Sequence, residues 1–440
     1  MSKEGLFFGG VESRIPRRQL ERKGANMKSR HRMPVGVFIF IIILLCIPAM
    51  LFGAGKAKVT FFWNLYEGLT EDFRVQFQDA FNASHPDIEL ECVPVDWELS
   101  HDKLTTAIAG GNPPEMSVIG TYWLLEFMDM GAVDEISKYV SPTTVNNIIP
   151  AIMEGKIGGK IMGLPVAAGA RIMAYNSDIT KVEPRTMEEL RQEAIRVNNP
   201  PGRYGFIMPG KKSLELTDFI YFLYAADGDV FQMNPDGTYG KCIVNSPAGV
   251  KALEFMVQLA SKDKVVQEGY LSQIRQDSHP TFIAGKAGYV FIGAWVDSLY
   301  KTAGSTFDLR YGQIPPFRGS KGKTLVVTDS IVMFKGAKNK TEAGKVLDEF
   351  YKDEWKARYD QMIGFPPVTI SAGKLPQFQT PLYKTLVAAS MRSKGWPLMS
   401  QWSECADIIW DAVVEAFQQS KTPKAALDDA AAKINTLRGL

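Results

Sequence analysis

The sequence is poor in the residues from which metal centres, disulfide frameworks and activated nucleophiles are usually built. Its 440 residues include four histidines and four cysteines. None of these has the spacing of a zinc site or of a disulfide framework, and no G-x-S-x-G motif occurs. The loop at residues 319–324 suggests a phosphate-binding loop, but that motif requires glycine where Phe317 stands. We therefore expect no catalytic or metal-binding constellation.

An excess of one charge is also lacking. The formal net charge is +2. Residues 1–55 hold 9 of the 50 Lys and Arg and 3 of the 48 Asp and Glu, which leaves 41 basic and 45 acidic residues and a net charge of −4 in the rest. Such a balance lacks the excess of basic residues that is typical of proteins that bind a nucleic acid or an anionic membrane.

Only one apolar run is long enough to cross a membrane. It covers residues 35–52; basic residues precede it, and the small residues 53–55 follow it. This is the order of a secretory signal peptide, so we expect export and cleavage near residues 53–55. A membrane anchor is the alternative interpretation, because about 18 apolar residues can span a bilayer.

The first residues fit this signal poorly. Residues 1–26 add further basic residues ahead of a signal that already has its own, so Met27 competes with Met1 as the start of translation. Leucines precede Cys46, where a lipoprotein signal requires a small residue, so a lipid anchor is not expected. Beyond the signal three cysteines remain, and whether two of them pair is left open: Cys92, Cys242 and Cys405.

The remaining chain alternates strands with helices. Residues 59–63 are predicted to form a buried strand, and Thr70 is predicted to cap a helix with one apolar stripe of Phe73, Phe77 and Phe81. Strands at 88–92 and 116–119 follow, each with a helix after it. Strands alternating with helices predict a parallel α/β sheet. Residues 56–440 are too many for one ordinary core and suit two lobes.

The most informative stretch is residues 159–179, which read GKIMGLPVAAGARIMAYNSDI. Two short apolar runs follow each other, joined by a small-residue bridge and Arg171. We interpret this as a strand that crosses from one lobe to another. The segment resembles the first lobe crossover of family-1 extracellular solute-binding proteins, the sugar-type receptors of bacterial ABC importers. In that family a GK-x-x-G-L-P run precedes a YN-x-D run.

Further motifs carry the same resemblance in order along nearly the whole chain. Each is weak alone, and their order and spacing make the set specific. One position departs from the pattern, because Glu115 stands where the family usually has Asp. The matching segments are 81–88, 107–115, 184–190, 282–287, 293–295, 315–316, 331–334 and 364–366.

The resemblance implies an α/β fold of the two-lobe periplasmic-binding-protein type (type II), with discontinuous lobes joined by a hinge. After the extension and signal at 1–55, lobe one would comprise 56–167 and 323–357, and lobe two 168–322 and 358–440. The solute would lie in the cleft, and closure of the hinge would trap it.

The implied function is that of a receptor rather than an enzyme. The protein would bind a mono- or oligosaccharide in the periplasm or another extracytoplasmic space and deliver it to the permease subunits of an ABC transporter. We expect a monomer without a cofactor or a nucleic-acid partner. A receptor for glycerol phosphate or a polyol is the first alternative, and a secreted carbohydrate-active enzyme is the second.

Sugar recognition requires flat apolar faces for the ring and planar polar groups for its hydroxyls. Ligands of open α/β sheets lie beyond the carboxyl ends of strands, so we select residues that follow predicted strands or crossovers. Core packing is the competing interpretation for Trp63, and a structural ion pair is the competing one for Arg171. The predicted ligand residues are Trp63, Asn64, Tyr66, Glu67, Tyr122, Arg171, Trp295, Asp329, Trp396 and Trp402.

Overall fold

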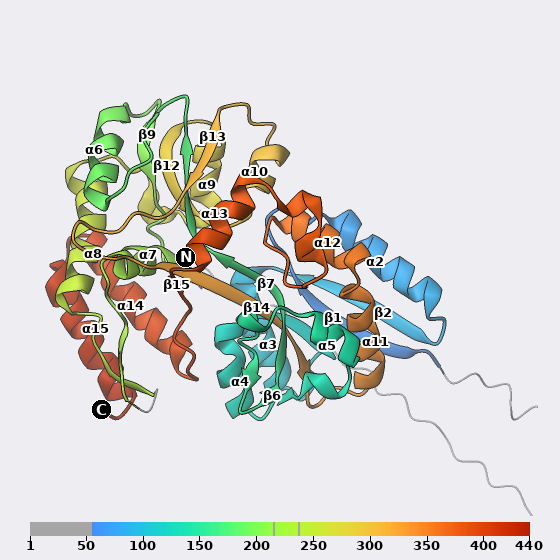
Figure 1. Ribbon diagram of the computed structural model, residues 1–440. Helices are drawn as coiled ribbons and strands as arrows, with labels where there is room; N and C mark the ends of the chain where they lie inside the picture. The colour runs from blue at the N-terminus through green and yellow to red at the C-terminus, as the bar shows by residue number, and fades with distance from the viewer. Residues whose placement is uncertain (1–54, 214–215, 236–237) are drawn as a thin grey trace, which may run out of the picture. The chain divides into compact units, whose positions relative to one another are not determined.

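Two large β-sheets, of seven and four strands, organise the part of the chain that the structure describes. The computed structural model describes residues 55–213, 216–235 and 238–440. The predicted signal sequence, the start at Met27 and the lipidation question at Cys46 lie outside these residues. The seven-stranded sheet with its helices is called the first domain below, and the four-stranded sheet with its helices the second domain (Figure 1).

The first sheet has the strand order β15-β14-β3-β1-β2, with β4 and β7 also paired to β14. Strand β1 is parallel to β2 and β3, as predicted, whereas β14 is antiparallel to β3, β4 and β7. The strands are β1 (Ala57–Asn64), β2 (Ile88–Val95), β3 (Met116–Gly120), β4 (Val133–Asp134), β7 (Gly163–Ala170), β14 (Thr324–Phe334) and β15 (Ser393–Lys394).

The second sheet has the order β13-β8-β12-β9. Strand β12 is parallel to β9 and antiparallel to β8. Its strands are β8 (Ile172–Asn176), β9 (Tyr204–Ile207), β12 (Ala287–Ile292) and β13 (Leu309–Gly312). Two small hairpins stand apart: β5 (Lys156–Ile157) with β6 (Lys160–Ile161), and β10 (Phe231–Met233) with β11 (Tyr239–Cys242).

Helices cover both faces of the first sheet. Helix α2 begins after Thr70, whose side chain accepts a hydrogen bond from the Phe73 amide, and its three predicted phenylalanines are buried. The Trp63 indole packs on rings of α2, α11 and α12, while the next residue, Asn64, bonds to Ser100 of α3 on the opposite face. These helices are α2 (Glu71–Ser84), α3 (Trp97–Ala109), α4 (Leu124–Asp129), α5 (Pro142–Asn147), α11 (Lys340–Phe350) and α12 (Asp353–Ile363).

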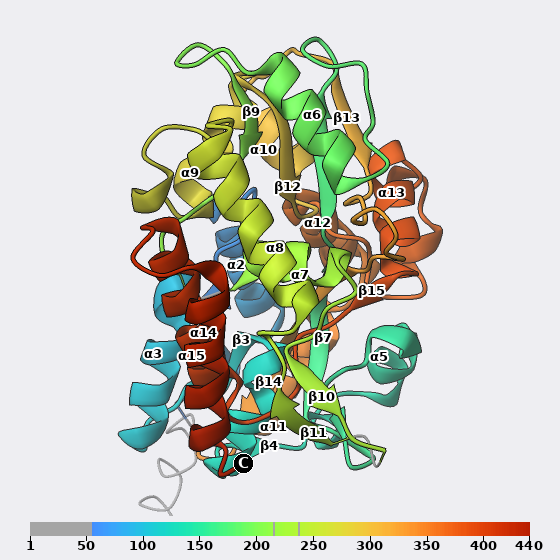
Figure 2. The same ribbon diagram turned by 90° about the vertical axis from the view of Figure 1, so that its left-hand side faces the viewer.

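The remaining helices lie around the second sheet and beside the crossings. Helices α14 and α15 run side by side and pack on α8 (Figure 2). Helix α13 contacts strands of both large sheets. The bounds are α6 (Met187–Val197), α7 (Thr217–Ala225), α8 (Pro247–Val257), α9 (Arg275–Ile283), α10 (Val296–Thr302), α13 (Pro381–Ser390), α14 (Trp402–Phe417) and α15 (Pro423–Leu437).

The predicted crossover at residues 159–179 is confirmed. Strand β7 belongs to the first sheet and β8 to the second, and only Arg171 separates them. The chain returns between β13 and β14. The lobe boundaries proposed from the sequence at 167/168 and 357/358 fall inside β7 and α12, and the exact division stays a proposal.

A buried ion pair fixes α12 to the first crossing. Lys356 donates to the Asp360 carboxylate and to the carbonyl of Val166 in β7 at 2.9 Å, and both side chains of the pair are fully buried. Burial raises the pKa of Asp360 to about 6 and lowers that of Lys356, and each partner's charge opposes this effect. Each charge of the pair therefore offsets the cost of burying the other.

We expect Lys356→Met to lower the free energy of unfolding by about 3 kcal/mol, because it leaves the Asp360 carboxylate buried without its cation. The double variant Lys356→Met, Asp360→Asn removes both charges and is expected to recover at least half of that loss. Urea unfolding of the wild-type protein, of the single variants Lys356→Met and Asp360→Asn, and of the double variant completes a double-mutant cycle. A double variant no more stable than Lys356→Met would contradict this account.

Candidate functional site

Ring and charged side chains from both domains meet where the chain crosses between the sheets. The Tyr66 hydroxyl donates to an Asp329 carboxylate oxygen at 2.7 Å. The Tyr66 ring lies 5.8 Å from that of Phe365, which in turn stacks on Trp295 at 6.1 Å. We call this group the crossover cluster, and its members are Tyr66, Arg171, Arg275, Trp295, Asp329 and Phe365.

Trp295 is the centre of the cluster. The guanidinium groups of Arg171 and Arg275 lie 4.7 and 5.3 Å from the centroid of its ring, and the His279 ring stacks nearly parallel to it at 6.3 Å. The indole is 3% exposed, and its Nε1 has no hydrogen-bond partner among the residues that the structure describes. Cation–π attraction of this kind is stronger where water is excluded.

Two glycines allow this arrangement. The indole of Trp295 folds back over Gly293, where an added Cβ would lie 1.9 Å from the ring. Gly364 ends α12 in the left-handed region with φ +78°, and a Cβ there would meet the carbonyl oxygen of Ala294 at 2.4 Å. Only glycine allows both close approaches, so each aromatic of the Trp295–Phe365 pair follows a required glycine.

A break in strand register accompanies Asp329. The β7–β14 ladder shifts between Asp329 and Ser330, and Asp329 pairs with both Ala167 of β7 and Gly120 of β3. Irregularities of this kind redirect a side chain and are frequent beside binding sites. Here the redirected carboxylate reaches Tyr66, and the Asp329 side chain is buried.

The charges around Trp295 do not all pair. The Arg275 Nε lies 3.6 Å from a carboxylate oxygen of Glu67, which joins the two domains. Arg171 forms no ion pair among the described residues. Burial raises the pKa of Asp218 to about 7, although both arginines act to lower it. Burial, with a contribution from the same arginines, lowers the pKa of His279 to about 3, so that its imidazole is neutral at pH 7.

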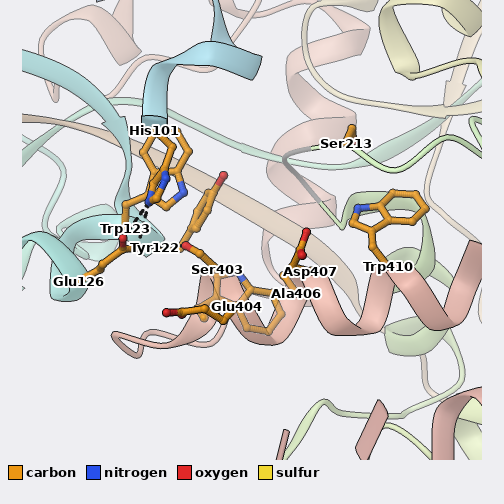
Figure 3. Close-up of a pocket in the computed structure, with 11 residues that line it drawn as sticks. His101, Tyr122, Trp123, Glu126, Ser213, Ser403, Glu404, Ala406, Asp407 and Trp410 are labelled. Atoms are coloured by element: carbon orange, nitrogen blue, oxygen red, sulfur yellow. Dashed lines mark hydrogen bonds and ion pairs between the residues drawn. The ribbon is translucent and has the colours of Figure 1, made fainter. Parts of the chain in front are cut away.

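A cavity of about 310 Å³ lies between α14 and the helices that follow β2 and β3. On one side are His101, Tyr122, Trp123 and Glu126, and on the other the residues of α14 (Figure 3). His101 Nε2 lies 3.0 Å from both carboxylate oxygens of Glu126. Burial disfavours the charged imidazole, but Glu126 and Asp102 outweigh it and raise the pKa of His101.

A second cavity, of about 370 Å³, lies between α9 and α10. Its wall is mainly apolar, with Glu67, Gln276 and His279 as polar members. His279 lies against Trp295, and Glu67 lies against Arg275, so the cavity adjoins the crossover cluster. Both cavities are within the size range of small-molecule sites.

Comparison with known proteins identifies the family. The sequence profile of the bacterial extracellular solute-binding protein family matches residues 76–385. A putative binding protein of Brucella abortus is 30% identical over 393 residues, which are 87% of this chain and 93% of that protein. The chain belongs to the bacterial extracellular solute-binding proteins. The resemblance seen in the crossover motifs is thereby confirmed, and the family places the protein outside the cytoplasm.

Two further relatives are informative. The maltose-bound structure of T. maritima MalE3 superposes with a TM-score of 0.78 at 22% identity and covers 87% of this chain and 100% of that one. This likeness confirms the predicted two-domain fold. A mannitol-binding protein of Pseudomonas aeruginosa is 29% identical over 141 residues, 30% of this chain and 32% of that protein.

The structure of this solute-binding protein places most of the predicted ligand residues in two groups. Tyr66, Arg171, Trp295 and Asp329 belong to the crossover cluster, and Glu67 joins it through Arg275. The aromatics Tyr122 and Trp402 line the first cavity, and Trp396 packs on both at 5.6 and 5.5 Å. Their contact with a solute stays a prediction.

Two predicted ligand residues lie elsewhere. Trp63 is fully buried in a cluster of rings and lines neither of the two cavities described above. Asn64 is also fully buried and exchanges hydrogen bonds with Ser100. The alternation of side chains along β1 explains why Trp63 is buried, since Val59, Phe61 and Trp63 share the face that packs on helices.

Several site residues were missed by the sequence analysis. Arg275 and Asp218 stand in the first turns of α9 and α7, and no strand precedes them directly. His101 and Glu126 also lie on helices. Phe365 belongs to a motif that was noted only for its resemblance. A rule that selects residues after strands cannot find groups that helices supply.

Two other kinds of site are absent from the described residues. Across 55–213, 216–235 and 238–440, no helix is long and apolar enough to span a membrane. That same part of the chain holds no group of His, Cys, Asp and Glu suited to a metal ion. Cys92, Cys242 and Cys405 are buried free thiols, and burial raises the pKa of Cys242 to about 11.

The raised pKa of Asp218 predicts a pH effect on stability. The folded protein binds a proton here that the unfolded chain, with an ordinary pKa near 4, has already lost. Stability from this group is therefore present at low pH and is lost as pH rises through 7. From pH 6 to 8 we expect the wild-type protein to lose about 1 kcal/mol relative to Asp218→Asn, measured by urea unfolding. Equal pH dependence in both proteins would contradict this.

Proposed function

We propose that this solute-binding protein is the receptor of an ABC importer and carries a sugar in the cleft between its two domains. The observation that carries the proposal is the crossover cluster. It joins an indole face, a second ring and planar charged groups from both domains, in a family of binding proteins. Aromatic faces suit the C–H side of a sugar ring, and carboxylates and guanidinium groups suit its hydroxyls.

The fold relatives support the sugar class, because one of them was solved with maltose. The mannitol-binding relative favours a polyol as the second candidate. A secreted carbohydrate-active enzyme is the third. Incubation with labelled oligosaccharides separates it from a receptor, since a receptor binds its solute without turnover.

The role in transport forms part of the same proposal. Membrane permease subunits would be separate proteins that receive the solute from the closed, loaded receptor. A monomeric, exported protein with a cleaved signal and without a cofactor or nucleic-acid partner suits this role. The two domains and the hinge between them would then account for the length of the chain.

Ligand binding is expected to close the domains. A thermal-shift screen of neutral, polyol and acidic sugars finds the ligand, since a ligand at 100 times its Kd adds about 2.7 kcal/mol to stability. Small-angle X-ray scattering with that ligand should then show a smaller radius of gyration than without it. An unchanged scattering curve at saturation would count against a hinged receptor, and no stabilisation by any sugar would count against the sugar class.

Trp295→Ala is expected to weaken sugar binding by about 2 kcal/mol, roughly thirtyfold, because the sugar loses its stacking face. Apo stability should fall by less than the 3–5 kcal/mol typical of a core Trp→Ala change. The affinity is measured by calorimetric titration and the apo stability by the denaturant midpoint, both on the Trp295→Ala protein.

Trp63→Ala is the matched control. Its indole lies fully buried among rings of β1, α2, α11 and α12, so this variant should lose stability while its folded fraction keeps its affinity. The assignment of Trp295 fails if its variant behaves like the Trp63 variant, with a collapsed midpoint and intact affinity.

A further inference from the structure

Arg171 is a buried cation that has no ion-pair partner in the described part of the chain. Its side chain is 2% exposed, and it stands in the crossing between β7 and β8. The guanidinium donates one long hydrogen bond, from Nη1 to the Gly169 carbonyl at 3.5 Å, and its Nε has no partner. No ion pair to Arg171 exists among the described residues. A guanidinium has five donors, so most of its hydrogen-bonding capacity is unused.

Arg191, an arginine with a structural role, differs from Arg171 because it has a carboxylate partner. Arg191 forms two hydrogen bonds to the Asp263 carboxylate, at 2.6 and 2.8 Å. A charge removed from water without such a partner costs several kcal/mol. Arg171 is nevertheless fixed at its base, because its amide donates to the Leu325 carbonyl and its carbonyl accepts from the Thr324 hydroxyl, both at 2.8 Å. An uncompensated cation held in place in a binding protein points to a partner that the solute supplies.

The neighbouring charges do not satisfy Arg171. Glu67 faces Arg275. Asp218 lies within electrostatic reach of both arginines, but it accepts a hydrogen bond from the Thr217 hydroxyl at 3.2 Å, and with a pKa of about 7 it is only partly ionised at neutral pH. Asp329 accepts a hydrogen bond from the Tyr66 hydroxyl, so none of these carboxylates forms an ion pair with Arg171.

Two hydrogen-bond donors without a partner lie side by side here, one on Arg171 and one on Trp295. The indole Nε1 of Trp295, whose ring lies under the guanidinium, is also buried without a partner. A guanidinium and an indole can only donate hydrogen bonds. A hydroxyl would bring a hydrogen of its own that needs an acceptor, whereas a carboxylate offers two oxygens and no hydrogen. A phosphate ester would bring −1.5 to −2 charges, more than one cation balances.

We infer that the solute of this receptor is an acidic sugar, and that Arg171 binds the carboxylate of a uronic-acid unit while Trp295 supports its ring. This inference rests on the proposed function and specifies its substrate class. The carboxylate takes the place of the missing counter-ion, with charge-assisted hydrogen bonds that are stronger than those to a neutral hydroxyl.

The test compares sugars that differ at one carbon. Glucuronate and galacturonate, with galacturonate di- and trisaccharides, are titrated calorimetrically against glucose, galactose and glucose 6-phosphate. We expect at least one uronate to bind on the order of 100-fold more tightly than its neutral parent. Arg171→Gln should remove that preference, so that the uronate and its neutral parent bind with equal affinity. Arg171→Lys, which keeps the charge, should retain part of the preference.

The control is Arg191→Gln, which breaks a structural pair away from the cluster and should lower stability without changing affinity. Arg171→Met should lower the apo melting temperature less than Lys356→Met does, because it leaves no partner carboxylate buried without its cation; an equal loss would show that Arg171 has a structural counter-ion and would overturn the inference. Equal affinity for a uronate and its parent, or a preference for the phosphate, would also overturn it.

These outcomes separate the two proposals. Binding of a neutral sugar with closure, but without preference for any uronate, leaves the receptor function standing and rejects the acidic solute. Absence of binding by every sugar, both in this panel and in the thermal-shift screen of neutral, polyol and acidic sugars, rejects both. Preference for a uronate that survives in Arg171→Gln places the carboxylate elsewhere and rejects the assignment of Arg171.

Discussion

The pairing of β14 with β7 is the constraint on which the rest of this structure depends. The ladder runs from Val326 opposite Ala170 to Val332 opposite Gly163 and joins segments far apart in the sequence. Because β7 leads through one residue into β8, and β14 follows β13, the ladder holds two crossings between the domains side by side. Neighbouring crossings form a hinge, and the register break at Asp329 places a carboxylate of the site on the same ladder.

Much of the fold could be predicted because the decisive signals are local. The stripe of Phe73, Phe77 and Phe81 predicts α2, and its burial follows from helical periodicity alone. The crossover was readable because glycine, proline and small residues bound two apolar runs. The antiparallel pairing of β14 in the first sheet was not readable from local patterns, since it depends on a segment that returns after the whole second sheet has been built.

The residues of the candidate site could be predicted from the sequence only where they directly follow strands. Trp63 and Trp295 both follow apolar strand runs, yet alternation along β1 directs Trp63 into the core, while Gly293 lets Trp295 fold back toward the crossing. Arg275 and Asp218 come from the first turns of helices, and their closeness to Arg171 arises from packing between distant segments. No sequence spacing encodes such closeness, nor whether a buried arginine has a counter-ion.

The two domains meet through polar contacts, and this bears on how binding controls closure. Arg275 faces Glu67 at 3.6 Å, Ser403 donates to Glu126 at 3.1 Å, and Ser298 donates to the Met362 carbonyl at 2.9 Å. Each such contact contributes little net free energy, since water replaces it on opening. The balance between open and closed forms is then set by a solute that contacts both domains at once. A solute that also pairs with Arg171 would supply this buried cation with an ion-pair partner in the closed cleft, so binding and closure would stabilise each other.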